Sequence, residues 1–149
     1  VVCKPGVAEG TERVTNAIRQ LLAEMDLTDD IFRIGLEYNI GTGGKRLSET
    51  QRQKLHMARA LLKRPDFLIV NQALNSLDGK SQQKIMETVL AKSKGSDGEK
   101  FGVIWVPMNL SFSKMFERVL VFKQGVLVAD GTPDELKENS SDYSELTGG

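Results

Sequence analysis

Residues 40–78 constrain the fold more than any other part of this sequence. Ser48-Glu49-Thr50-Gln51 has the form of a capping box, in which a Ser hydroxyl and a Gln amide bond each other's backbone N–H groups at a helix start. A helix is therefore predicted to begin at Ser48 and to have one apolar and one basic face. The apolar face carries Leu55, Ala58, Leu61 and Leu62, and the basic face carries Arg52, His56, Arg59 and Lys63.

The remaining elements are predicted from hydrophobic periodicity and turn residues. Residues 1–10 are expected to be a loop or a frayed start, and a further turn is expected at 31–36. Further helices are expected at 11–25, 78–92 and 110–116 and after the cap at Thr132, and strands at 67–70, 101–106, 119–122 and 126–129. Strands that alternate with helices indicate an α/β core with parallel strands, finished by an antiparallel hairpin.

Composition excludes several classes of protein. Lys plus Arg and Asp plus Glu are 20 each, so the formal net charge is zero. No net electrostatic attraction would therefore draw the chain to nucleic acid or to an anionic membrane. Aromatic residues are 6% and do not alternate with the basic ones, so no nucleic-acid partner is expected. Cys3 is the single cysteine, which excludes an internal disulfide and fits a reducing compartment. No apolar run approaches the roughly 20 residues that cross a bilayer, and no signal peptide is expected.

The order of residues in 40–78 resembles that of the ATP-binding cassette (ABC) ATPases. Their signature, LSGGQ-x-Q-x-x-x-x-A-R-A-L, is matched by Leu47-Ser48-Glu49-Thr50-Gln51, by Gln53 and by Ala58-Arg59-Ala60-Leu61. Their Walker B text, LLLLDEATSALD, is matched in spacing by residues 67–78. The resemblance covers residues 40–136 and, more loosely, the helix before them.

This resemblance implies the C-terminal part of a P-loop-type ABC ATPase domain whose P-loop strand lies upstream of Val1. Residues 1–39 would be a helical subdomain, 40–136 the signature helix, Walker B-like strand and α/β core, and 137–149 a mobile tail. Gly79-Lys80-Ser81 matches the end of a P-loop, but the first glycine of that motif would be Leu74. Because a side chain there obstructs the tight turn, these residues are interpreted as a helix start.

The resemblance also assigns three catalytic positions, and each carries a different residue here. Asn71 stands at the position of the Mg²⁺ ligand and Gln72 at that of the catalytic carboxylate, and neutral amides are weaker ligands and bases. Met108 stands at the position of the histidine that senses the γ-phosphate, and it has no hydrogen to donate. Asn71 and Gln72 could equally be loop amides after a buried strand, and whether they are natural or engineered stays open.

The remaining candidate residues lie in the signature and after the Walker B strand. The signature-like residues Leu47, Ser48, Glu49, Thr50 and Gln51 form a weak nucleotide site, since Glu49 and Thr50 replace two glycines and Glu49 adds a negative charge. Asp78 matches an aspartate that faces a partner cassette, and it could instead cap the next helix. His56 is expected to be exposed, and no metal site is predicted.

Together these residues favour a degenerate nucleotide-binding domain without ATP hydrolysis of its own, acting structurally or regulatorily in a transport complex. Its partners would be a second nucleotide-binding domain and a transmembrane subunit, and it would lie at the cytoplasmic face of a membrane. ATP and Mg²⁺ would bind only with missing or partner elements. Two alternatives remain: an active ABC ATPase with a P-loop upstream or in a partner, and a nucleotide-independent interaction module.

Overall fold

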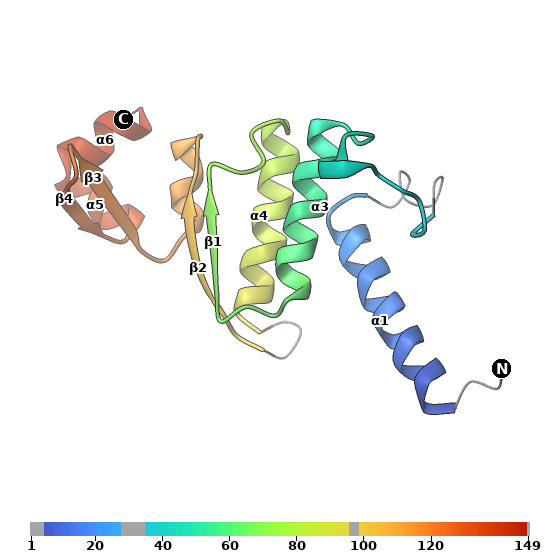
Figure 1. Ribbon diagram of the computed structural model, residues 1–149. Helices are drawn as coiled ribbons and strands as arrows, with labels where there is room; N and C mark the ends of the chain where they lie inside the picture. The colour runs from blue at the N-terminus through green and yellow to red at the C-terminus, as the bar shows by residue number, and fades with distance from the viewer. Residues whose placement is uncertain (1–4, 28–34, 96–98, 149) are drawn as a thin grey trace. The chain divides into compact units, whose positions relative to one another are not determined.

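The computed structural model describes residues 5–27, 35–95 and 99–148, and Figure 1 shows the elements in chain order. Two compact units are present, one made of residues 1–69 and 73–104 and the other of residues 70–72 and 105–149. The expected turn at 31–36 falls largely outside the described residues. None of the described helices is both long enough and apolar enough to cross a bilayer.

Helix α1 (Pro5–Glu24) begins earlier than the sequence predicted. Residues 5–10 were expected to be a loop because of their proline and glycines, and that expectation is wrong. Proline is tolerated in a first helical turn, where its missing N–H would have no partner in the helix. The apolar residues of α1 are buried only at its C-terminal end, since Leu22 is 5% exposed and Val14 is 60% exposed.

The first unit also contains α3 (Glu49–Leu62) and α4 (Gly79–Ser93), and both confirm predicted helices. Helix α1 contacts α3. The largest fully buried side chains lie at the end of α1, in the loop before α4 and in α4: Met25, Leu74, Ile85, Met86 and Val89. The buried side chains of α4 recur at helical spacing, as its periodicity predicted.

Two buried lysines fasten the end of α1 to the other helices. Lys54 of α3 is 8% exposed, and its Nζ lies 3.2 Å from both the backbone oxygen and Oδ2 of Asp26. Lys92 of α4 is also 8% exposed, and its Nζ lies 2.8 Å from Oε2 of Glu24. The hydrogen bond from Lys54 holds the pKa of the Asp26 carboxyl below its ordinary value.

Strands β1 (Phe67–Asn71) and β2 (Gly102–Val106) form a two-stranded sheet. The N–H of Gly102 donates to the oxygen of Asp66 at 2.8 Å, and that of Gln72 donates to the oxygen of Val106 at 2.9 Å. Both bonds advance along the two strands in the same sense, so the strands are parallel. The predicted parallel pairing is confirmed.

The second unit contains the predicted hairpin, made of β3 (Val119–Lys123) and β4 (Val126–Gly131). Its register shifts between Val121 and Phe122, which marks a β-bulge. Gln124 and Gly125 both have positive φ, 52° and 79°, as a two-residue turn with the twist of a hairpin requires. Helix α5 (Pro133–Asn139) follows and is capped by Thr132, as predicted. The cap is a capping box in which Glu135 takes part.

Residues 137–149 were expected to be a mobile tail, and the structure corrects this. Residues Ser141–Thr147 form helix α6, in which Tyr143 is 6% exposed and packs with Val121 and Leu136. The hydroxyl of Tyr143 lies 2.7 Å from Oγ of Ser113 in η2 (Leu110–Met115), a 3-10 helix at the position of the predicted short helix. One buried aromatic ring with a satisfied hydroxyl orders a segment otherwise poor in apolar residues.

Candidate functional site

The chain enters the signature-like segment through a glycine-rich turn. Gly41, Gly43 and Gly44 have φ values of 76°, 66° and 72°, in the region that favours glycine, and η1 (Thr42–Gly44) lies within the turn. Gly44 is also buried, and a Cβ atom there would lie 3.5 Å from Cδ of Arg52. The positive φ angles of these glycines allow the chain to turn sharply into α3.

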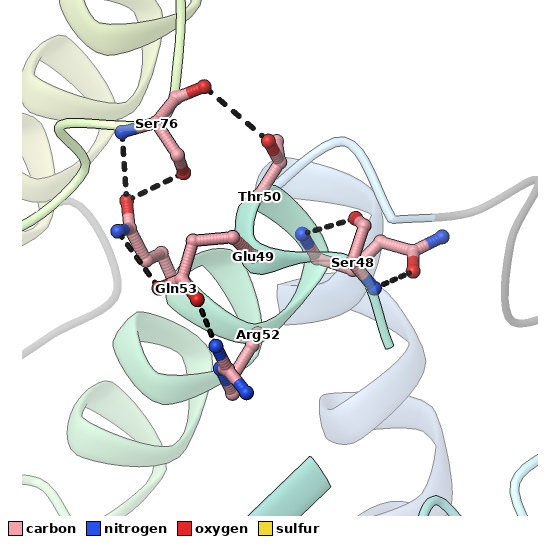
Figure 2. A network of polar contacts seen from close by, with 7 residues as sticks. Ser48, Glu49, Thr50, Arg52, Gln53 and Ser76 are labelled. Atoms are coloured by element: carbon pink, nitrogen blue, oxygen red, sulfur yellow. Dashed lines mark hydrogen bonds and ion pairs between the residues drawn. The ribbon is translucent and has the colours of Figure 1, made fainter. Parts of the chain in front are cut away.

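Ser48 is the N-cap of α3, as predicted. Its Oγ accepts from the N–H of Gln51 at 3.1 Å, and its own N–H donates to Oε1 of Gln51 at 2.9 Å. Both members of the capping box are therefore occupied within the helix (Figure 2). A hydroxyl that stabilises its own helix in this way does not require a ligand to explain it.

Replacing Ser48 by alanine is expected to lower the free energy of unfolding by about 0.5 to 2 kcal/mol, because one backbone donor of the first turn loses its acceptor. Urea denaturation followed by circular dichroism measures this change. Thr147→Ala is the matched control, since that hydroxyl bonds the Tyr143 oxygen one turn earlier near the end of α6 and caps no helix start. An unfolding midpoint that does not move in Ser48→Ala would contradict the capping role.

Glu49 and Thr50, which stand where the signature has glycines, bond to other residues of the same chain (Figure 2). Glu49 forms an ion pair with Arg52 and accepts from Nε2 of Gln53 at 3.1 Å. Thr50 donates from its hydroxyl to the backbone oxygen of Ser76 at 3.3 Å. Oε1 of Gln53 accepts from the N–H and the hydroxyl of Ser76 at 3.3 and 2.9 Å. This first turn of α3 is joined to the loop before α4.

Asp78 is the N-cap of α4. Its Oδ1 accepts from the N–H groups of Lys80 and Ser81, both at 3.0 Å, and its Oδ2 accepts from the Ser81 hydroxyl at 2.6 Å. The bonds from Ser81 hold the pKa of the Asp78 carboxyl below its ordinary value. Of the two roles expected for Asp78, capping is present in the structure. The amides that a phosphate would use at Gly79-Lys80-Ser81 are occupied by this carboxylate.

The three positions that the family resemblance assigns to catalysis lie at or just beyond the ends of β1 and β2. Asn71 is the last residue of β1 and is exposed. Gln72 has a φ of 47°, and its N–H bonds the oxygen of Val106, the last residue of β2. Met108 follows two residues later and is 61% exposed. The structure therefore brings Asn71, Gln72 and Met108 to the carboxyl-end edge of the sheet, where α/β folds place ligands.

The side chains of Asn71, Gln72 and Met108 at this edge are neutral and cannot act as acids or bases. An amide can donate and accept hydrogen bonds, but it carries no charge and does not take up a proton near neutral pH. Thioether sulfur is only a weak acceptor. His56 is exposed on α3, as expected, and among the described residues no group of three His, Cys, Asp or Glu side chains could hold a metal ion.

Sequence reasoning missed the residues that join α3 to the loop before α4. Gln53 was identified only as part of a motif match, and Ser76 was not considered. The available signal was the serine at position 76, where the LLLLDEATSALD text has alanine. It also missed Lys54 and Lys92, because a lysine on a helix normally lies in solvent.

No family model matches the chain. A putative export ATP-binding/permease protein of Rickettsia bellii is 33% identical over 135 residues, which cover 91% of this chain and 22% of that protein. The beta-(1-->2)glucan export ATP-binding/permease protein NdvA of Rhodopseudomonas palustris is 34% identical over 145 residues, 97% of this chain and 23% of that protein. The chain therefore spans about a fifth of the length of these relatives.

A solved structure supports the same relationship. A bacterial Atm1-family ABC exporter with ATP bound superposes with a TM-score of 0.74 at 25% sequence identity. The match covers 88% of this chain and 22% of the exporter chain. Both the sequence matches and this structural match extend over most of the described residues.

Proposed function

The chain belongs to the ABC export proteins, as part of their nucleotide-binding region, and we propose that this region does not hydrolyse ATP. It acts structurally or regulatorily beside a second nucleotide-binding domain. A transmembrane subunit or domain completes the complex, which places this region at the cytoplasmic face of a membrane. The matched relatives have permease in their names, which supports a transmembrane partner in general terms.

The observation that carries this proposal is the set of neutral side chains at the carboxyl-end edge of the β1–β2 sheet. Phosphoryl transfer to water needs Mg²⁺ held by charged oxygen and a group that orients the attacking water. Asn71 and Gln72 supply amides at these positions, and Met108 supplies a thioether at the third. One such change could be compensated by neighbours. The three changes together remove the charged metal ligand, the base and the hydrogen-bond donor to the γ-phosphate.

The described residues do not fit a magnesium nucleotide by themselves. The carboxylate at the start of α4 is occupied as a helix cap, and so are the two amides that it binds. At the signature-like end, Glu49 adds a negative charge next to the position where a γ-phosphate would approach Ser48. Binding of ATP and Mg²⁺ therefore depends on elements outside these residues, in the rest of the protein or in the partner domain.

Hydrolysis of Mg-ATP by the purified full-length protein tests this proposal. The expected turnover is at the level of a sample without protein, and Asn71→Asp with Gln72→Glu is expected to leave it there. These two changes restore carboxylates but leave a methionine at position 108, where the family has the histidine. Release of inorganic phosphate is measured, with a hydrolysing ABC exporter assayed in parallel.

Readily detected turnover by the unchanged protein would overturn the proposal and favour an active ATPase whose carboxylates come from a partner. Turnover that appears only in the double variant would show that the two amides alone prevent hydrolysis. Calorimetric titration with ATP distinguishes a nucleotide-binding region from an interaction module. Binding heat in the unchanged protein excludes the module.

A further inference from the structure

The first turn of α3 and the loop at residues 73–78 form one hydrogen-bonded cluster (Figure 2). Ser76 contributes its N–H and its hydroxyl to Oε1 of Gln53, and its backbone oxygen accepts from Thr50. Glu49 accepts from Nε2 of the same Gln53 and so holds its amide in the orientation that presents Oε1 to Ser76. Every polar group of Ser76 is therefore bonded to α3.

Three side chains of this cluster, Glu49, Thr50 and Ser76, stand where the chain departs from the ABC motifs, whereas Gln53 matches the signature. Positions 49 and 50 are glycines in LSGGQ, and position 76 is alanine in ATSALD. Neither glycine nor alanine has a side-chain donor or acceptor. Of the two substitutions that crowd a phosphate at Ser48, Thr50 bonds the loop directly and Glu49 orients the Gln53 amide that bonds it.

The loop is also held in a conformation that it would not keep alone. Leu74 has a φ of 67°, a left-handed conformation that costs a leucine about 1 to 2 kcal/mol. Its side chain is 1% exposed, so burial offsets this cost. At the other end of the loop, the N–H of Leu77 bonds the oxygen of Leu74 at 3.1 Å, and Nε2 of Gln82 bonds the oxygen of Leu77 at 2.9 Å.

We propose that Glu49, Thr50, Gln53 and Ser76 form a latch that fixes residues 73–78 on α3 in the absence of nucleotide. The loop ends at Asp78, so the latch preforms the surface that this region offers to a second nucleotide-binding domain. That this surface faces a second nucleotide-binding domain rests on the function proposed above. Gln53 and Ser76 are positioning residues, because they act through the loop and contact no substrate.

Hydrogen exchange of the full-length protein, followed by mass spectrometry without nucleotide, tests the latch. Gln53→Ala removes both bonds to Ser76 and is expected to speed exchange of the amides in residues 73–78 by roughly 5- to 10-fold, as loss of about one net hydrogen bond predicts. Ser76→Ala keeps the backbone bond and is expected to give a smaller increase, of roughly two-fold. Unchanged exchange in Gln53→Ala would overturn the proposal.

Gln83→Ala is the matched control. Gln83 also donates from Nε2 to a glutamate one helical turn away, Oε1 of Glu87 at 2.8 Å, and it lies on α4 outside the latch. This variant is expected to leave exchange in residues 73–78 unchanged. An increase equal to that of Gln53→Ala would show that the effect is general destabilisation and would also overturn the latch.

A second arm adds Mg-ATP to the unchanged protein. A preformed loop is expected to exchange at the same rate with and without the nucleotide. Protection of residues 73–78 by Mg-ATP would overturn the latch, because nucleotide would then order the loop. Neither exchange result measures turnover, so the latch and the proposed loss of hydrolysis can fail independently.

Discussion

Replacing Lys92 by alanine is expected to lower the free energy of unfolding by about 3 kcal/mol, one of the largest effects in this chain. The side chains of Lys92 and Glu24 are 9% and 25% exposed, and Oε2 of Glu24 is a buried atom. Removing the lysine leaves a carboxylate in a poorly solvated position without its compensating charge. Urea denaturation monitored by circular dichroism measures the loss.

Two further variants separate the ion pair from a loss of packing. Glu24→Gln combined with Lys92→Met removes both charges and keeps similar volume, so it is expected to recover most of the lost stability. Lys63→Ala, at an exposed position that follows α3, is expected to change stability by at most about 0.5 kcal/mol. If Lys92→Ala behaved like Lys63→Ala, the ion pair would not be what fastens α1.

Leu74→Ala is expected to cost about 3 kcal/mol, because the side chain is 1% exposed and its removal leaves a cavity. Leu74→Gly is expected to be more stable than Leu74→Ala by about 1 kcal/mol, because glycine adopts a φ of 67° without strain. The order of the two variants is therefore reversed from that of an ordinary buried position. Chemical denaturation of both proteins gives the comparison.

Leu61 provides the matched control for this reversal. It is 7% exposed inside α3, where glycine is less stable than alanine by about 1 kcal/mol. Leu61→Gly is therefore expected to be the less stable of its pair, and Leu74→Gly the more stable. If glycine were worse at both positions, the left-handed backbone at Leu74 would not be a source of strain.

Elements defined by neighbouring residues were predictable from the sequence. Ser48 and Gln51, like Thr132 and Glu135, satisfy backbone groups within four residues of each other, so their pattern alone places a helix start. The turn at Gln124-Gly125 predicts its hairpin for the same reason. The family resemblance and the altered residues at positions 71, 72 and 108 also required no coordinates, and sequence and structure matches support that family.

What depended on contacts between distant residues was decided by the tertiary structure alone. Whether a lysine, serine or tyrosine is buried or exposed depends on the groups that it can bond. Here those groups lie far away in sequence: Glu24 for Lys92, Gln53 for Ser76, and Ser113 for Tyr143. The short polar segment at residues 141–147 is ordered as a helix because the Tyr143 side chain is buried. Sequence patterns record local hydrogen bonding and periodic burial, whereas these pairings arise only when the folded chain brings the groups together.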